Sequence, residues 1–382
     1  MKKILAKIKM KTLYIILKIF RFPKTQKKEN EEFSRINQIY SSKETKKINN
    51  KFIIDSKVDL TFIVPVYNAE KFISRCLDSL LNQKTEYNYN IICINDGSND
   101  ESLKLLKEYE EKNTIIKVFN QRNSGIAETR NFGINHITGK YISFVDIDDF
   151  ITNDFVQKLL KCSYENDADI VRCNYYEYNS EQELVIKTGK NKENKVINGH
   201  IGREILNYKG YPWGGVFKSE LWKNIQFPNG FWYEDMIIRM ILFRKAKKFA
   251  YINDKLYFYC IHKNNISKTI EKTSNTKCLD QYYLVKQLVK LSEDIDLQMD
   301  ESLYCDIMYE YGVVLWLRTR GIDKKLRKRV FIDACEFINS IDFKYCFNKE
   351  ETIVHKIFDK QDYIMWNIYA IYKMLGVKYG GE

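Results

Sequence analysis

Leu60-Thr61-Phe62-Ile63-Val64-Pro65-Val66 is a run of β-branched and aromatic residues at which the pattern of the chain changes. From Asp59 onward, short runs of this kind alternate with stretches of helical spacing. The next predicted strands are Asn90–Ile94, Ile115–Phe119 and Tyr141–Val145. Strands that alternate with helices are typical of βαβ units, and therefore of a parallel sheet with helices on its faces. The sequence thus predicts an α/β fold for this part of the chain.

Polar residues gather where these strands end. Asp96 follows the second strand, and Asp146-Ile147-Asp148-Asp149 follows the fourth. Ligands of open α/β sheets bind beyond the carboxyl ends of the strands, so these residues should converge on one crevice. Carboxylates this close repel one another unless a cation lies among them, and Mg²⁺ or Mn²⁺ prefers oxygen ligands. For an isolated D-x-D, a solvated turn that caps the next helix is the more common explanation.

Four short motifs occur in a recognisable order. They are Pro65-Val66-Tyr67-Asn68, Asn95-Asp96-Gly97-Ser98-Asn99-Asp100, Asn123-Ser124-Gly125-Ile126-Ala127-Glu128-Thr129-Arg130-Asn131 and Asp146-Ile147-Asp148-Asp149. Together they resemble the family-2 glycosyltransferases with the GT-A fold, strongly over residues 59 to about 160 and more weakly to about 270. The resemblance implies an α/β, Rossmann-like domain that binds a nucleotide-sugar. A mostly helical C-terminal region would follow it.

In that family a nucleotide-sugar, most often a UDP-sugar, lies across the strand ends. Tyr67 would pack against the uracil, and Asp96 would accept a hydrogen bond from the uracil N–H. Arg130 carries a fixed fork of donors that suits phosphates or carboxylates, so a salt bridge to the D-x-D carboxylates is also compatible with its position. The family usually has Asp where this chain has Asn95. The donor-binding residues implied by the resemblance are Pro65, Val66, Tyr67, Asp96, Gly125, Arg130, Asp146 and Ile147.

The resemblance also implies a cofactor, Mn²⁺ or Mg²⁺. Asp148 would ligate the ion that bridges the two phosphates, and Asp146 would hold the ribose or a metal-bound water. A bound cation stabilises the negative charge that develops on the diphosphate leaving group.

A base is needed for the acceptor hydroxyl, because an alcohol is a poor nucleophile until its proton is being removed. Residues 227–235 resemble the family's Glu-Asp motif, which implies that Asp235 is the base of an inverting displacement and that Glu234 orients the acceptor or the base. Taken alone, this acidic pair is equally well explained by stabilisation of a helix N-terminus.

Two further segments resemble parts of the acceptor half. Trp213 matches a tryptophan that faces the acceptor sugar, and aromatic faces stack on sugar rings. The lysine usual two residues later is Gly215 here. His262 follows Tyr257 and Tyr259 in a pattern that closes over the diphosphate, so it is a candidate phosphate contact, although an ordinary surface or core histidine is the more frequent role.

The N-terminus has a different character. Residues 1–28 contain ten Lys and Arg and no acidic residue, which leaves about +2 of the net charge of +12 for the rest of the chain. The main body therefore lacks the basic stripe of a nucleic-acid binder. Residues 1–28 predict a basic amphipathic helix, which can bind an anionic membrane surface or dock on protein. Nine Cys without C-x-x-C spacing favour a reducing compartment, and no apolar run reaches the length of a spanning helix.

These observations predict a glycosyltransferase in the cytoplasm, peripheral on the inner face of the cytoplasmic membrane. It would be an inverting, metal-dependent hexosyl- or N-acetylhexosaminyltransferase that moves a sugar from a UDP-sugar to a hydroxyl of a growing cell-surface glycan or lipid-linked glycan, as in capsule, lipopolysaccharide or lipooligosaccharide. The alternative is an inactive glycan-binding or membrane-associated scaffold with the same fold. No Gly-rich phosphate loop follows a strand, which disfavours nucleotidyltransferases and NAD-dependent dehydrogenases.

The sequence also predicts boundaries. The expected segments are a basic helix at 1–28, a linker at 29–57, a GT-A domain at 58–272 with its donor half at 58–160 and its acceptor half at 161–272, and a helical region at 273–382.

Overall fold

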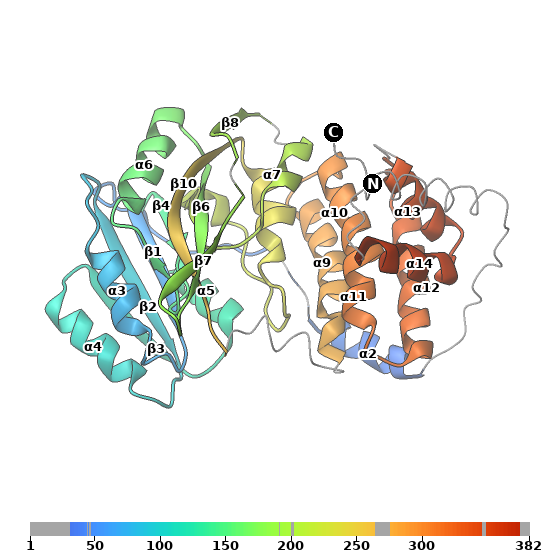
Figure 1. Cartoon of the computed structure of the whole chain (residues 1–382), viewed down its shortest axis with the longest axis horizontal. Coiled ribbons are helices and arrows are strands. Elements are labelled where there is room, and N and C mark those ends of the chain that lie inside the picture. Colours follow the sequence, from blue (N-terminus) through green and yellow to red (C-terminus); the bar gives the residue numbers. More distant parts are fainter. Residues whose placement is uncertain are drawn as a thin grey trace. The chain divides into compact units, whose positions relative to one another are not determined.

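The computed structural model describes residues 31–43, 45, 47–190, 192–199, 202–263, 276–345 and 349–374. The chain divides into two compact units. The sheet unit comprises the described residues within 45–268 and 291–297, and the helical unit comprises those within 1–44, 269–290 and 298–382. Figure 1 shows the chain with its elements labelled. The predicted basic helix at 1–28 lies outside the described residues.

The described part of the sheet unit contains one mixed sheet with the strand order β3-β2-β1-β4-β9-β6-β10-β5, while β7 pairs with β6 and β8 with β10. The strands are β1 (Leu60–Val66), β2 (Tyr89–Asp96), β3 (Ile116–Gln121), β4 (Tyr141–Phe144), β5 (Phe150–Ile151), β6 (Ile170–Asn179), β7 (Leu184–Thr188), β8 (Lys195–Asn198), β9 (Gly215–Lys218) and β10 (Lys248–Ile261). The first four are parallel to one another, as the alternating pattern predicts, whereas β9 is antiparallel to both β4 and β6.

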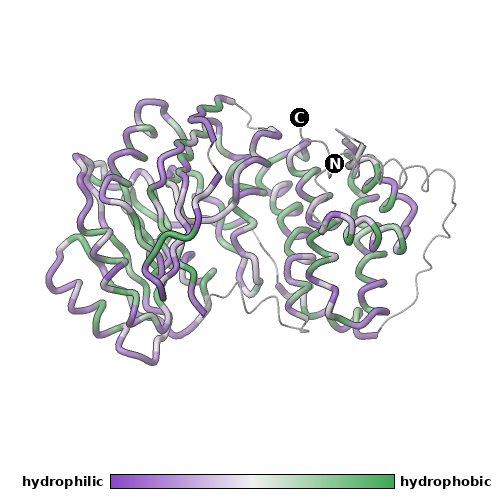
Figure 2. Tube along the Cα trace, in the orientation of Figure 1, coloured by the Kyte–Doolittle hydropathy of each residue, from purple (hydrophilic) through white to green (hydrophobic). Residues whose placement is uncertain are grey.

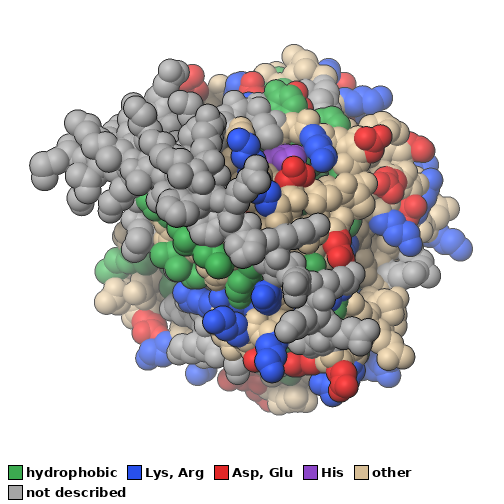
Figure 3. All heavy atoms as spheres, turned by 90° about the vertical axis from the view of Figure 1, so that its right-hand side faces the viewer, with side chains coloured by type: hydrophobic (Ala, Val, Ile, Leu, Met, Phe, Trp, Pro, Cys, Tyr) green, Lys and Arg blue, Asp and Glu red, His purple; other side chains and the backbone are tan. Residues whose placement is uncertain are grey.

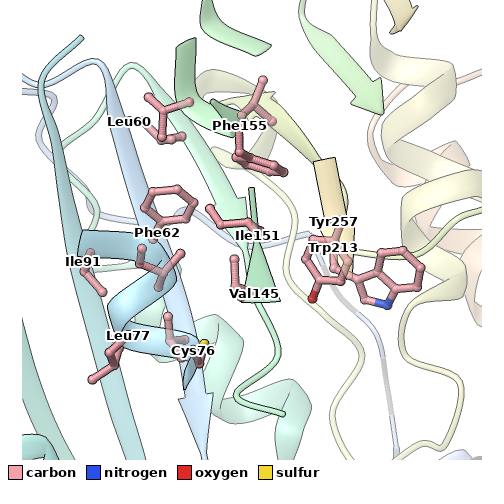
Figure 4. Close-up of a cluster of buried hydrophobic side chains, with 14 of the residues drawn as sticks. Leu60, Phe62, Cys76, Leu77, Ile91, Val145, Ile151, Phe155, Trp213 and Tyr257 are labelled. Atoms are coloured by element: carbon pink, nitrogen blue, oxygen red, sulfur yellow. The ribbon is translucent and has the colours of Figure 1, made fainter. Parts of the chain in front are cut away.

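Helices pack on both faces of the parallel strands. The helices of this unit are α3 (Ile73–Leu81), α4 (Ser102–Lys112), α5 (Ile126–Ile134), α6 (Phe155–Asn166) and the short α7 (Phe243–Lys245). Side chains of α3 and α6 join Leu60, Phe62 and Ile91 in one buried cluster, part of which Figure 4 shows. On the other face α5 contacts β1 and β2 closely. A Cβ at Gly133 would come within 2.6 Å of Ile63 Cγ2, so only glycine allows this approach.

This arrangement explains where polar residues collect. β1, β2 and β4 run in the same direction, so their carboxyl ends, at Val66, Asp96 and Phe144, lie along one edge of the sheet. β1 has the bounds predicted for it, and β2 extends the predicted strand to include Asp96. The motifs that follow these strands therefore lie along one edge of the sheet, where ligands of open α/β sheets bind.

The helical unit is built from α2 (Glu31–Ser41), most of α9 (Asp280–Asp294), α10 (Glu301–Tyr309), α11 (Leu315–Thr319), α12 (Lys324–Ser340), α13 (Lys349–Asp359) and α14 (Tyr363–Met374). Hydrophobic and hydrophilic residues alternate along these helices in Figure 2. The prediction of a linker at 29–57 is wrong for α2. Phe33, Ile36 and Tyr40 lie on one face of α2 and are buried, so this polar-looking stretch carries an amphipathic helix.

α14 has two unlike faces. Met365, Trp366, Tyr369 and Ala370 are buried, whereas Ile364, Ile368 and Ile371 are 53%, 41% and 47% exposed. In the space-filling view of Figure 3, hydrophobic side chains gather beside several Lys and Arg side chains.

Within the described part of the chain, no helix combines the length and the apolar character needed to cross a membrane.

Candidate active site

The turns after β1 and β2 are held together by side-chain to backbone hydrogen bonds. Asn68 adopts a left-handed backbone (φ 47°), its N–H donates to Ser98 Oγ (2.9 Å), and its Oδ1 accepts from the Asn99 N–H (2.8 Å). Gly97 is also left-handed (φ 68°), and a Cβ there would meet Asn123 N at 2.6 Å. The residue before Asn68, Tyr67, is left 49% exposed at the mouth of this edge. The two turns thus form a rigid rim with an aromatic side chain open to solvent.

Asp96, at the end of β2, anchors the loop that precedes α5. Its Oδ1 accepts from Gln121 Nε2 and from the Ser124 N–H, both at 2.8 Å, and its Oδ2 accepts from the Gly125 N–H at 2.9 Å. A carboxylate offers about four acceptor positions, so roughly one remains. Asp96 can therefore hold this loop and still accept one hydrogen bond from a ligand.

Arg130, on α5, joins two motifs that are distant in the sequence. Its guanidinium is buried, with Nη2 2.9 Å from Asp146 Oδ1 and Nη1 2.6 Å from Glu234 Oε1. Because one cation serves two carboxylates, the D-x-D turn and the Glu-Asp motif are fixed relative to each other. Burial and the nearby Asp148 and Glu234 carboxylates raise the pKa of Asp146, while Arg130 opposes that rise.

The remaining carboxylates of the D-x-D turn have different environments. Asp149 is buried, and its oxygens accept from the Tyr257 hydroxyl (2.6 Å) and from the Cys260 N–H (2.7 Å). Asp148 is partly exposed, and its Oδ2 lies 2.8 Å from His262 Nε2. The His262 ring in turn stacks on Phe72, with centroids 4.9 Å apart. Asp149 is therefore a structural carboxylate, whereas Asp148 faces the crevice.

The chemistry of this pair fits a metal ion shared with a substrate. Among the described residues, no group of three or more His, Cys, Asp and Glu side chains is arranged to hold a metal ion. Asp148 and His262 nevertheless offer an oxygen and a nitrogen side by side. Mg²⁺ in nucleotide sites takes only one or two carboxylates from protein, with phosphate oxygens and water completing the shell. The donor set suits a cation that arrives with a diphosphate better than one held by protein alone.

Asp235 follows a strained turn. Gly230 has φ 75°, and Tyr233 has φ 68°, a conformation that is rare for an aromatic residue and concentrates at functional sites. Burial, and then the neighbouring Glu234 carboxylate, raise the pKa of Asp235 to about 7, against the opposing effect of Arg130. The backbone then turns into a π-helical segment, Ile238–Leu242, that runs into α7. A carboxylate whose pKa is near neutral is suited to accept a proton.

Trp213 lies inside a stack of tyrosines. Its ring is nearly parallel to those of Tyr211, Tyr257 and Tyr259, with centroid distances of 4.5, 4.7 and 5.3 Å. Figure 4 shows Trp213 beside Tyr257. Trp213 is only 6% exposed, while Tyr211 is less buried and is influenced electrostatically by Asp235. Tyrosine side chains already cover much of the Trp213 ring, so Tyr211 is more accessible to a ligand than Trp213.

The structure thus brings several predicted residues together. Arg130, Asp146 and Glu234 form one ion-paired group, Asp148 and His262 form a second pair, and Asp235 interacts electrostatically with the first group. Pro65, Val66 and Ile147 are buried in strand or turn positions behind this edge, and Gly125 begins α5 in a left-handed conformation (φ 87°).

Arg75 is a contributor that the sequence motifs do not predict. From α3 its Nη2 donates to the Asp148 carbonyl (3.0 Å) and approaches Ser180 Oγ and Cys260 Sγ, both at 3.4 Å. It therefore supports the turn that carries Asp148. Arg75 lies on a helix, outside the four strand-end motifs and outside the buried face of α3, so the local sequence pattern does not indicate this role.

Comparisons with known proteins agree with this arrangement. Residues 61–218 match the model of "Glycosyl transferase family 2". Glycosyltransferase GlyA of Streptococcus pneumoniae is 34% identical over 226 residues, which are 56% of this chain and 32% of GlyA. The uncharacterized glycosyltransferase EpsJ of Bacillus subtilis is 30% identical over 236 residues, which are 59% of this chain and 68% of EpsJ. The chain therefore spans about a third of GlyA and about two thirds of EpsJ.

A solved structure shows the same fold. The crystal structure of Staphylococcus aureus TarS residues 1–349 in complex with UDP-GlcNAc superposes with a TM-score of 0.55 at 18% identity, over 85% of this chain and 94% of that one. Fold and strand-end motifs together define a glycosyltransferase fold of the GT-A type, with a mostly helical C-terminal region. With the match to the family model and to EpsJ, the chain belongs to glycosyltransferase family 2.

Proposed function

We propose that this protein is an inverting glycosyltransferase that moves a sugar, as a hexosyl or N-acetylhexosaminyl group, from a UDP-sugar to a hydroxyl of a cell-surface glycan. The observation that carries the proposal is the ion-paired group in which Arg130 joins Asp146 to Glu234. Each buried charge costs several kcal/mol in desolvation, and removing one partner of a buried ion pair costs on the order of 3–5 kcal/mol. A scaffold that only needed the fold would therefore gain nothing from carboxylates gathered at one edge.

The donor residues have distinct roles in this proposal. Tyr67 stacks on the uracil, and the remaining acceptor position of Asp96 takes the uracil N–H. Asp148 and His262 would hold Mg²⁺ or Mn²⁺ together with the diphosphate, and such an ion would supply the positive charge that stabilises the leaving group. Arg130 fixes Asp146 toward the ribose side of the crevice. The UDP-GlcNAc bound to the structurally similar TarS supports a uridine nucleotide as donor.

The acceptor residues act on the other side of the reacting carbon. Asp235 removes the proton of the acceptor hydroxyl, and its pKa of about 7 supports this role, since the group can hold and release a proton near neutral pH. Glu234, fixed by Arg130, orients the acceptor beside Asp235. Tyr211 and Trp213 form the aromatic wall for the acceptor ring. A direct attack by the activated hydroxyl inverts the configuration at the sugar carbon.

The nucleotide dependence is the first test. The melting temperature of the full chain is measured with UDP, GDP, CMP and TDP, each with Mn²⁺ and with EDTA, because a ligand of the native state raises it. We expect a shift with UDP that is lost in EDTA. If UDP still raised the melting temperature in EDTA, the metal would be removed from the proposal. If no nucleotide raised it, the inactive scaffold would be favoured.

A peripheral position on the inner face of the cytoplasmic membrane is part of the proposal. The basic segment 1–28 and the exposed face of α14, with Ile364, Ile368 and Ile371, support it. Apolar side chains flanked by basic residues bind anionic interfaces. Cosedimentation with anionic liposomes tests this, using the chain without residues 1–28 and the Ile368→Glu variant. Retention of both variants at the wild-type level would exclude each of these segments as a required anchor, and a full chain that does not cosediment would remove the membrane from the proposal.

A further inference from the structure

Arg172 occupies an unusual position for an arginine. It lies within β6, paired with Gly215 of β9 on one side and with Tyr251 of β10 on the other. Its neighbours Val171 and Cys173 point into the core cluster beneath α3 and α6, so the Arg172 side chain points to the opposite face. There it is 5% exposed, and its guanidinium lies 5.6 Å from the centre of the Phe217 ring. A cation is thus built into the middle of the sheet.

This cation has no anionic partner. No hydrogen bond or ion pair joins the Arg172 guanidinium to any other residue that the structure describes, and its Nη1 is fully buried without a hydrogen-bond partner. Burial lowers the pKa of Arg172 to about 10, so the side chain is still protonated at neutral pH. Unpaired buried charges are strongly unfavourable, and native proteins rarely keep one that serves no purpose.

A second cation lies on the same face. Lys192 is partly buried, with its Nζ 4.3 Å from the centre of the Tyr208 ring and 5.3 Å from that of Tyr251. It also donates to the Asn207 carbonyl. Burial, and then the positive charges of Lys209, Lys190 and Arg172, lower the pKa of Lys192. Arg172 and Lys192 therefore place two positive charges among tyrosine rings on this face, and the nearby Glu204 carboxylate pairs with Lys195.

The Arg172 guanidinium also lies directly behind the acceptor wall. Gly214 and Gly215 follow Trp213, and a Cβ on Gly215 would come within 2.9 Å of Arg172 Cδ and 3.2 Å of Nη1. On Gly214, which is left-handed (φ 71°), a Cβ would meet only Arg172 Nη2 within 4 Å, at 4.0 Å. Among the described residues, a Cβ at Gly214, next to Trp213, would therefore meet no atom but the guanidinium within 4 Å.

We propose that Arg172 and Lys192 form an anion-binding site that takes a phosphate or carboxylate group of the acceptor glycan. The inference rests on the proposed function, because it assumes that the Trp213 loop faces the acceptor. The guanidinium fork matches the geometry of both oxyanions, and the tyrosine walls exclude water that would weaken the contact. The donor diphosphate is a poor occupant, since β9 separates β6 from β4 and its carboxylates. Acceptors that carry a negative charge would then be preferred to neutral ones.

The site is tested on the full chain with defined anions. With UDP and Mn²⁺ present at saturation, the melting temperature is titrated with glucose 6-phosphate, glucuronate and inorganic phosphate, with glucose and sodium chloride of equal ionic strength as controls. We expect the charged sugars to stabilise the wild-type protein and glucose not to. In Arg172→Met their apparent affinity should fall by about tenfold or more, the loss of one charge-assisted hydrogen bond.

Matched variants separate the alternatives. Arg172→Lys and Lys192→Gln should show intermediate affinities, and Lys158→Met, which removes a surface cation of α6 that pairs with Asp154, should match the wild type. The proposal would be overturned if the charged sugars stabilised Arg172→Met as much as the wild type. It would also be overturned if inorganic phosphate stabilised the wild type and the charged sugars did not. If Arg172→Met does not fold, unchanged affinity in Lys192→Gln overturns it. The rise in melting temperature with UDP is measured separately. Its absence would refute the proposed function and not the anion-binding site.

Discussion

Arg130 and Arg172 are both buried in the sheet unit, yet their surroundings are opposite. Arg130 lies in a carboxylate cluster with Asp146 and Glu234 and satisfies both. Arg172 lies in a cationic site with Lys192, among tyrosine rings, and forms no ion pair with the described residues. A charge that is neutralised within the protein fixes geometry, whereas a charge left without a partner is available to a ligand. The comparison separates an arginine that fixes two carboxylates in the proposed catalytic site from one that we propose binds a ligand.

The largest effect is expected within the carboxylate cluster. Asp235→Asn should lower kcat by roughly 10²- to 10⁴-fold, the usual contribution of a general base. The variant keeps the shape of the side chain and loses only its ability to accept the proton, so UDP binding should be unchanged. Transfer from a radiolabelled UDP-sugar and the UDP-dependent rise in melting temperature measure the two properties. Wild-type turnover by this variant would contradict the assignment of Asp235 as the base.

The two arginines should differ in their contribution to stability. Arg130→Met leaves Asp146 and Glu234 without their cation, and it should lower the free energy of unfolding by about 3–5 kcal/mol. Arg172→Met removes an unpaired cation, so in chloride buffer its free energy of unfolding should equal or exceed that of the wild type. Urea denaturation of both variants gives the comparison. Equal destabilisation by the two substitutions would show that Arg172 is held by the protein as firmly as Arg130.

The carboxylate cluster could largely be predicted from the sequence, and the cationic site could not. Asp96 ends β2, and Asp146 and Asp148 lie in the turn after β4, so the order of the motifs was enough to bring them to one edge. Arg172 lies inside a strand, and only the pairing of β6 with β9 and β10 reveals what surrounds it. The ion pair between Arg130 and Glu234 likewise joins residues 104 positions apart, a contact that no local pattern contains.

The wrong prediction for α2, and the covered ring of Trp213, also have physical causes. The composition of α2, dominated by Glu, Asn, Ser and Gln, suggests a linker, although Phe33, Ile36 and Tyr40 recur at helical spacing. Trp213 is matched to the acceptor side by its motif and residue type. How far tyrosines of β10 cover its ring depends on the sheet pairing, which the local pattern does not contain.

A smaller effect is expected for the metal contact. Asp148→Ala should weaken UDP binding in Mn²⁺ by at least roughly 10- to 100-fold, the range for residues that only support metal ligands, because the loss of a direct ligand should cost no less. Binding in EDTA should not change, because only the metal-dependent part of the affinity is removed. Asp154→Ala, which removes a surface carboxylate paired with Lys158, is the matched control and should behave as the wild type. Equal UDP affinity of Asp148→Ala and the wild type in Mn²⁺ would exclude Asp148 as a ligand.

The pH dependence should distinguish the carboxylate cluster from the cationic site. The pKa of Asp235 is raised to about 7, so the basic form that accepts the proton is lost as the pH falls through that value. Below it, kcat/KM should drop about tenfold for each pH unit, since this parameter reports the free enzyme. Arg172, with a pKa of about 10, stays charged over the same range, so stabilisation by glucuronate should be constant from about pH 6 to 8. A kcat/KM that stays level down to about pH 5 would mean that Asp235 titrates at the ordinary pKa of an aspartate and is not tuned for proton transfer.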